Sequence, residues 1–206
     1  MRQRSNRLLT ALIAVSAVAL VAASGAMAAV IVGNGSSNVL TGTPQHDVIL
    51  GRAGDDTISA LAGRDLVRAG RGDDTVDGGP GRNFLSGGKD DDTLSGGAGG
   101  DVIFANRGRD HEDGGDGPDR LWALSRFDVE FIGDPNGDEL SGGNGDDRFR
   151  VRDGEVDLVH CGEGTDRVKA DQFDAVDNDC EHVDRRDVTS LDQVDDGDEN
   201  RVEPGN

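Results

Sequence analysis

Aliphatic residues recur at every ninth position between Gly33 and Trp122, each two positions after an Asp or Asn. Written in blocks of nine, this stretch gives ten blocks in register without a gap. The eighth position is Leu, Ile or Val in nine of the ten blocks, and Glu112 is the exception. Because neighbouring residues of a strand face opposite sides, we expect each block to contain a three-residue strand that points its aliphatic side chain inward. The other six residues of each block are predicted to form a turn.

Glycine is concentrated in these predicted turns and occupies the fourth position in seven of the ten blocks. Glycine adopts backbone conformations with positive φ that other residues adopt only with strain. A turn built this way can curl until its carbonyl oxygens face one point. The predicted turn glycines are Gly54, Gly63, Gly72, Gly81, Gly99 and Gly117, with Gly145 and Gly164 in later repeats.

The sixth position of the block is Asp or Asn in all ten cases. Calcium is a hard cation that takes six to eight oxygen ligands, from carboxylates and carbonyls alike. A turn that offers both kinds of oxygen suits it. The predicted metal ligands are Asp47, Asp56, Asp65, Asp74, Asn83, Asp92, Asp101, Asp110 and Asp119, with Asp138, Asp147 and Asp166 where the repeat resumes.

The composition by itself is typical of a disordered chain. The formal net charge is −20 over 206 residues, and there are six Phe, one Trp and no Tyr. Disorder, however, has no reason to keep an acidic and an aliphatic column in phase, so the periodicity favours a folded structure that binds cations. The acidic balance also argues against nucleic acid as a partner, because phosphate binding needs a basic footprint.

Three segments fit the pattern G-G-x-G-x-D-x-U-x, where U is aliphatic or aromatic: residues 78–86, 96–104 and 142–150. The pattern resembles the repeats-in-toxin (RTX, hemolysin-type) calcium-binding repeat and covers roughly residues 33–169, with interruptions. The resemblance implies an all-β fold. This would be a parallel β-roll, a right-handed β-solenoid with two repeats per coil, in which calcium ions lie between turns stacked one coil apart.

Stacking would bring equivalent acids together in two columns, about 4.8 Å from coil to coil. Their repulsion opposes folding unless a divalent ion lies between them, so we expect folding and calcium binding to be coupled, at about 10⁻⁴–10⁻³ M calcium. The best-formed site is predicted along Asn83, Asp101 and Asp119. The weakest are predicted near Asp47 and Asp110.

The N-terminal segment is predicted to be an export signal. Three arginines precede an apolar run at residues 8–23, and Ala26-Met27-Ala28 fits a cleavage site. A membrane anchor is the alternative, but the run is short for a span of about 20 residues. We therefore predict a signal peptide at 1–28, a repeat domain at 29–183 and an acidic disordered tail at 184–206. The product would be secreted and extracellular, without membrane insertion.

Two features fall outside the repeat. Residues 123–132 lose the motif and lie close to Trp122, which indicates either a strand pair that widens the roll or an aromatic ligand patch. Cys161 and Cys180 are the only cysteines, and eighteen residues lie between them. In an exported chain they are predicted to form a disulfide that braces the C-terminal end, with free thiols as the alternative.

No catalytic motif is found. Position 115, four residues after His111, is Gly rather than His, so there is no zinc-protease helix motif, and the glycine-rich stretches lack the context of a phosphate loop. Residue types alone leave a glycosidase acid pair open, but the repeat assigns most Asp to turns, and we expect no enzymatic activity. The sequence predicts a secreted Ca²⁺-binding β-roll. The alternative is an extracellular adhesive or surface scaffold that contacts a cell surface or polysaccharide, with few or no functional calcium sites.

Overall fold

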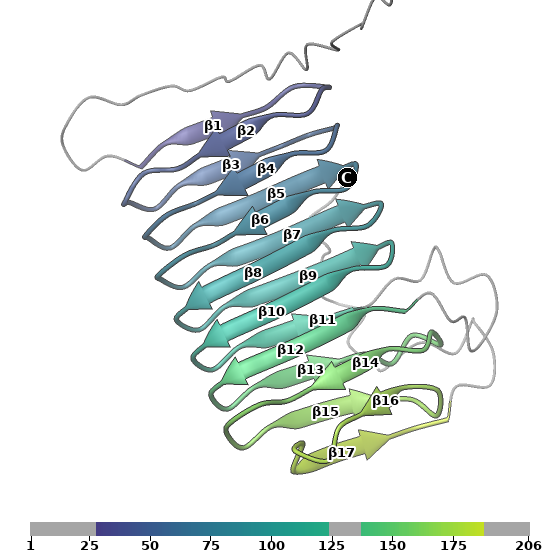
Figure 1. Ribbon diagram of the computed structural model, residues 1–206. Helices are drawn as coiled ribbons and strands as arrows, with labels where there is room; N and C mark the ends of the chain where they lie inside the picture. Colours follow the sequence, from purple (N-terminus) through teal and green to yellow (C-terminus); the bar gives the residue numbers. More distant parts are fainter. Residues whose placement is uncertain (1–27, 124–136, 188–206) are drawn as a thin grey trace, which may run out of the picture.

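The computed structural model describes residues 28–123 and 137–187, which form two parallel sheets and no helix (Figure 1). The nine-stranded sheet has the order β1 (Val30–Val32), β3 (Val48–Leu50), β5 (Leu66–Arg71), β7 (Phe84–Lys89), β9 (Val102–Arg107), β11 (Arg120–Trp122), β13 (Arg148–Arg150), β15 (Arg167–Ala170) and β17 (His182–Arg185). The eight-stranded sheet has the order β2 (Val39–Thr41), β4 (Thr57–Ser59), β6 (Thr75–Asp77), β8 (Thr93–Ala98), β10 (His111–Asp116), β12 (Glu139–Asn144), β14 (Leu158–His160) and β16 (Ala175–Val176).

Consecutive strands lie in opposite sheets, so the chain winds as stacked coils from β1 at one end to β17 at the other (Figure 1). The register confirms two repeats per coil, because Ile49 pairs with Val67 and Val67 with Leu85, eighteen residues further on each time. The predicted all-β parallel β-roll is therefore confirmed. Several strands are six residues long rather than three, because pairing continues into the next turn, as between Gly70 and Gly88.

The core is the predicted aliphatic column. Val67, Leu85 and Ile103 are completely buried, and each strand contributes essentially one such side chain. The interior is consequently narrow. Because apolar burial stabilises by about 25 cal/mol per Å², the small buried area contributes little stability. Glu112 in β10 also points into this core, between Leu94 and Leu140 in the neighbouring strands.

The turns need glycine because adjacent coils approach closely. All eight predicted turn glycines have positive φ, from 93° at Gly54 to 154° at Gly164. A Cβ on Gly99 would collide with the backbone carbonyl of Gly81 in the preceding coil. Asp90, which replaces glycine at the fourth position of its block, adopts a φ of 75°, a conformation that L-residues tolerate poorly.

The repeat resumes in the same stack after the interruption. β12 pairs with β10, and equivalent residues are 28 apart across this joint instead of eighteen. Most of the predicted interruption (123–132) lies outside the described residues, as do nearly all of the predicted signal peptide and most of the tail. In the described ranges no helix is long and apolar enough to cross a membrane.

Candidate calcium-binding turns

The predicted metal ligands all lie at the turn side of the strands, and each is at most 2 % exposed. One side-chain oxygen of each accepts a backbone N–H from the equivalent position in the preceding coil. The amide of Asp56 donates to Oδ1 of Asp74 at 2.7 Å, and that of Asp101 donates to Oδ1 of Asp119 at 2.7 Å. The same bond recurs through both columns as far as Asp166. These side chains thus link each coil to the next, a role that the sequence analysis did not predict.

The second carboxylate oxygen is left without a partner in most of these residues. Within the part of the chain that the structure describes, Oδ2 is buried and makes no hydrogen bond in nine predicted ligands: Asp56, Asp65, Asp74, Asp92, Asp101, Asp119, Asp138, Asp147 and Asp166. A buried carboxylate oxygen with no donor is destabilising, by about 1–3 kcal/mol or more for a charged group. Repetition of this feature in turn after turn indicates that something other than a protein donor satisfies these oxygens.

Backbone carbonyl oxygens surround the same space. A Cβ placed on Gly96 would lie 2.7 Å from Oδ2 of Asp101 and 2.6 Å from the carbonyl oxygen of Gly114, one coil away. The next turn of the column repeats the arrangement, with the Cβ position of Gly114 lying 2.6 Å from Oδ2 of Asp119 and 2.7 Å from the carbonyl oxygen of Gly142. Carboxylate and carbonyl oxygens therefore converge where glycine leaves room, which is the donor set that calcium prefers.

Asn83 shows what fills this space when no carboxylate is present. Its Nδ2 donates to the carbonyl oxygens of Gly79 at 3.1 Å and Gly96 at 3.3 Å. An amide N–H thus takes the position at which the other turns present only acceptors. The role of Asn83 as a ligand stays a prediction, and this geometry favours Asp101 and Asp119 over it.

Asp47 is also satisfied by the protein. Its Oδ2 accepts the backbone N–H of Thr43 at 2.5 Å and lies 3.1 Å from the Thr43 hydroxyl. The second oxygen is therefore already used within the turn. The weakness of the site near Asp47 stays a prediction, and this hydrogen bonding gives a reason for it.

The family comparison agrees with this donor set. A model of the RTX calcium-binding nonapeptide repeat matches in four copies, at residues 32–67, 53–85, 77–112 and 132–155, which together cover just over half of the chain. The chain belongs to the RTX calcium-binding repeat family. No curated protein matches it. The resemblance read from the repeats is thereby confirmed, and the RTX repeat accounts for a Ca²⁺-binding β-roll.

Burial raises the pKa of the acids in the RTX turns. Desolvation brings the pKa of Asp101 to about 6 and that of Asp119 to about 7. The pKa of Asp92 rises to about 9, because the charge of Asp110 adds to the effect of burial. The turns thus favour protonated carboxyls. A bound divalent cation favours the carboxylate form instead.

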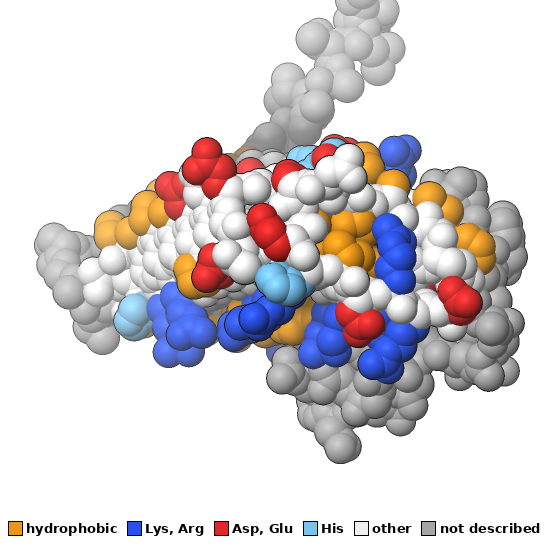
Figure 2. All heavy atoms as spheres, turned by 90° about the horizontal axis from the view of Figure 1, so that it is seen from below, with side chains coloured by type: hydrophobic (Ala, Val, Ile, Leu, Met, Phe, Trp, Pro, Cys, Tyr) orange, Lys and Arg blue, Asp and Glu red, His pale blue; other side chains and the backbone are white. Residues whose placement is uncertain are grey.

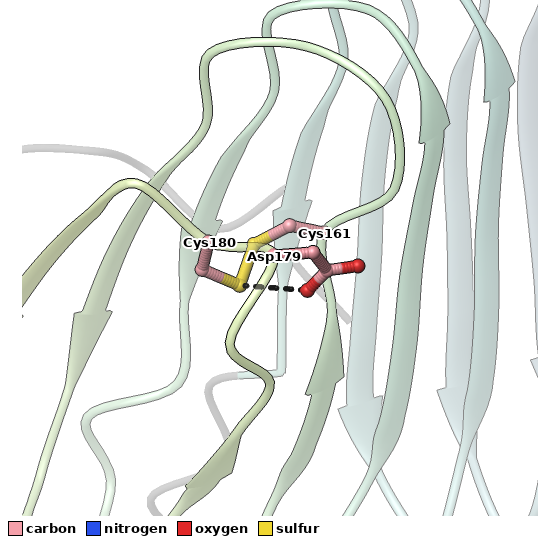
Figure 3. Close-up of side chains that lie close together, drawn as sticks. All are labelled: Cys161, Asp179 and Cys180. Carbon is pink, nitrogen blue, oxygen red and sulfur yellow. Dashed lines mark hydrogen bonds between the residues drawn. A yellow bond between two sulfur atoms is a disulfide. The ribbon is translucent and has the colours of Figure 1, made fainter.

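The predicted disulfide is present. Cys161, after β14, and Cys180, before β17, are bonded with their Cα atoms 5.2 Å apart (Figure 3). Asp179 Oδ1 lies 3.8 Å from Sγ of Cys180. Both sulfur atoms belong to the disulfide and are not thiolates, so these three side chains are not a metal site, since the thiolate is the metal ligand. The bond ties the last coils of the RTX roll together.

The sequence analysis missed several buried acids near the joint. Asp153 and Glu155 precede β14, and Asp171 and Asp174 precede β16, all at most 6 % exposed. Asp157 occupies the sixth position of a weak repeat and is completely buried. Glu112 is also buried, and burial raises its pKa, an effect that the nearby backbone amide of Ala105 opposes. Neither of its carboxylate oxygens has a partner at hydrogen-bonding geometry among the described residues. Coils of unequal length hide Asp153, Glu155, Asp171 and Asp174 from a search at a fixed period of nine, whereas Glu112 already stands out in the sequence as the break in the aliphatic column.

Proposed function

We propose that this chain is a secreted calcium-binding protein whose β-roll folds when Ca²⁺ binds in its RTX turns. The observation that supports this most directly is the buried Oδ2 of the sixth-position Asp, which lacks a donor among the described residues and shares the space at a turn glycine with a carbonyl oxygen of the next coil. The ligands would be this oxygen and the neighbouring backbone carbonyls. The proposed role is binding, without catalysis.

Counting bound ions tests this proposal. Residues 29–206 are dialysed to equilibrium against millimolar calcium, with excess magnesium as competitor. We expect several calcium ions per chain that magnesium does not displace, because Mg²⁺ demands a small octahedral site and retains its waters. No bound calcium would reject the function. Secretion is tested separately by sequencing the N-terminus of the exported chain, which should begin at Ala29.

A second function, as a surface scaffold, is favoured by the cations of the nine-stranded sheet. Two rows of cations run across it in register: Arg71, Lys89 and Arg107, and Arg120, Arg148 and Arg167. Figure 2 shows Lys and Arg side chains gathered along one side of a molecule that is otherwise acidic. Cations at the strand spacing of about 4.8 Å suit a polymer with repeated acidic groups.

Co-sedimentation tests the scaffold function. The chain is mixed with cell walls or an acidic polysaccharide, with calcium and with chelator. Sedimentation that requires calcium and is lost in Lys89→Gln would support it, with Arg64→Gln, an exposed cation between β4 and β5 that lies outside both rows, as the control. A chain that binds calcium but stays in the supernatant would leave calcium binding as its function and exclude the scaffold.

A further inference from the structure

Three buried carboxylates meet just after the joint of the roll. Asp138 precedes β12, and Glu155 and Asp157 precede β14 in the next coil. One oxygen from each lies within 4.8 Å of the others, and all three side chains are at most 3 % exposed.

This group differs from an RTX turn in its third member. Asp138 and Asp157 are sixth-position residues of stacked turns, and the amide of Asp138 donates to Oδ1 of Asp157 at 2.7 Å. Glu155 stands two positions before Asp157, where regular repeats have a glycine, as in Gly117 before Asp119. The coil here is nineteen residues long, and the positive φ moves to Gly154, at 102°. A carboxylate thus replaces the residue that elsewhere contributes only backbone.

The second oxygens of Asp138 and Asp157 have no donor. Oδ2 of each is buried and makes no hydrogen bond with any residue in the ranges 28–123 and 137–187, while Oδ1 is used by a backbone amide. The buried Arg152 donates from Nε and Nη2 to the carbonyl oxygens of Ala170 and Asp184, and it is not among the charges that act most strongly on Asp138 or Asp157. The neighbouring charges that act on Asp157 are those of other acids, Asp153, Asp138 and Asp174.

We propose that Asp138, Glu155 and Asp157 form a second class of cation site, which binds one Ca²⁺ mainly through carboxylates. Three converging carboxylates carry more charge than an RTX turn, and ligand charge is one of the factors that sets calcium affinity. This site therefore retains its ion at free calcium at least tenfold lower than the turns require. This inference rests on one part of the proposed function, namely that the roll is folded in the presence of calcium.

The test compares Glu155→Gln with Glu163→Gln. Glu163 undergoes the same substitution in the turn between β14 and β15, where its side chain is exposed. Calorimetric calcium titration of residues 29–206 should show one tight site in the unmodified chain and in Glu163→Gln. In Glu155→Gln that site should weaken at least tenfold, with the weaker sites unchanged. An unchanged titration of Glu155→Gln overturns the proposal. A Glu155→Gln variant that binds calcium as the unmodified chain does, and differs only in being more stable in chelator, also overturns the proposal. Protons rather than calcium would then satisfy these acids.

A measurement on the unmodified chain covers the case in which Glu155→Gln does not fold. Native mass spectrometry of the roll, folded in millimolar calcium and then followed as free calcium is lowered, should find one ion that is retained to a concentration at least tenfold below that at which the others dissociate. Loss of all ions together overturns the proposal. The two proposals fail separately. One tightly held ion without any weaker sites rejects the RTX-turn function alone, and weaker sites without a tightly held ion reject the carboxylate site alone.

Discussion

The two halves of the roll are built from the same kind of short parallel strand, but their coils are stabilised differently. Between residues 28 and 104 equivalent residues are always eighteen apart, and the apolar core is one continuous cluster from Ala29 to Ile103. Beyond Ala105 the spacing becomes 28, then 19, then 17, and a separate core cluster begins at Leu121. Glu112 lies between the two clusters, and acids are buried beside the later coils.

The comparison teaches what the repeat itself supplies. Where the motif is regular, glycine turns and sixth-position oxygens fix the coil length and link each coil to the next. Where it lapses, the sixth-position hydrogen bonds continue, as from the amide of Asp147 to Asp166, and features outside the motif are added to them: the Cys161–Cys180 disulfide and the hydrogen bonds from the buried Arg152. The predictions below are ordered from the largest expected effect to the smallest.

Gly99→Ala should disrupt the regular half. The new Cβ would meet the backbone of Gly81, and the φ of 143° is unsuited to alanine, so we expect a loss of about 3 kcal/mol or more in the free energy of unfolding in calcium. Chemical denaturation measures it. Gly35→Ala is the control, because a Cβ there meets no atom within 4 Å. Equal effects of the two substitutions would show that close coil contact is unimportant.

Removing the disulfide should affect the irregular half alone. Cys161→Ser with Cys180→Ser should destabilise the last coils by about 3 kcal/mol, by the chain-entropy model. Hydrogen exchange should show faster exchange in β14 to β17 and unchanged protection in β3 to β7. Uniform loss of protection along the roll would mean that the two halves unfold as one unit.

Glu112→Leu should make the two halves more alike. Leucine would continue the column between Leu94 and Leu140 and remove a buried acid, which should stabilise the roll by about 2 kcal/mol. Thermal unfolding measures the change. Leu94→Glu, which moves the acid into the regular half, should destabilise by at least as much. A destabilising Glu112→Leu would show that this carboxyl has a required partner.

Exchanging Asn and Asp at the sixth position should change the need for calcium. Asp101→Asn should let an amide donate to nearby carbonyls as Asn83 does, so the variant should bind fewer ions and fold at lower calcium. Asn83→Asp should bind more ions and should need a higher calcium concentration to fold. Ion counts and the calcium midpoint of folding measure both, and identical midpoints in the two variants would contradict the interpretation of Asn83.

In chelator, acid should partly replace calcium. Burial raises the pKa of Asp101 and Asp147 to about 6 and that of Asp74 and Asp119 to about 7, from a usual value of 3.8. The folded roll then binds more protons than the unfolded chain, so its stability is greatest near pH 4 and is lost as pH rises through 6 and 7. Thermal midpoints from pH 5 to 8 measure this, and a midpoint that rises with pH in chelator would contradict it.

Much of the fold could be predicted because it is local and periodic. The acidic position of Asp101 and the aliphatic position of Ile103 both recur every nine residues. This period alone predicts where strands and turns lie and which side chains are buried. The roles of Asn83 and Asp47 could not be predicted, since they depend on which donor lies beside the side chain after folding. Glu155 was missed because a coil of nineteen residues shifts it out of the period, and Cys161 with Cys180 was predicted because no other cysteine competes.

The central claim is that calcium in the turns makes the roll fold. Far-UV circular dichroism of residues 29–206 during a calcium titration, with magnesium as the control, tests it most directly. We predict a disordered spectrum in chelator that becomes β-rich near millimolar calcium and does not respond to magnesium. A spectrum that is already β-rich in chelator at neutral pH, and that calcium does not change, would contradict the account.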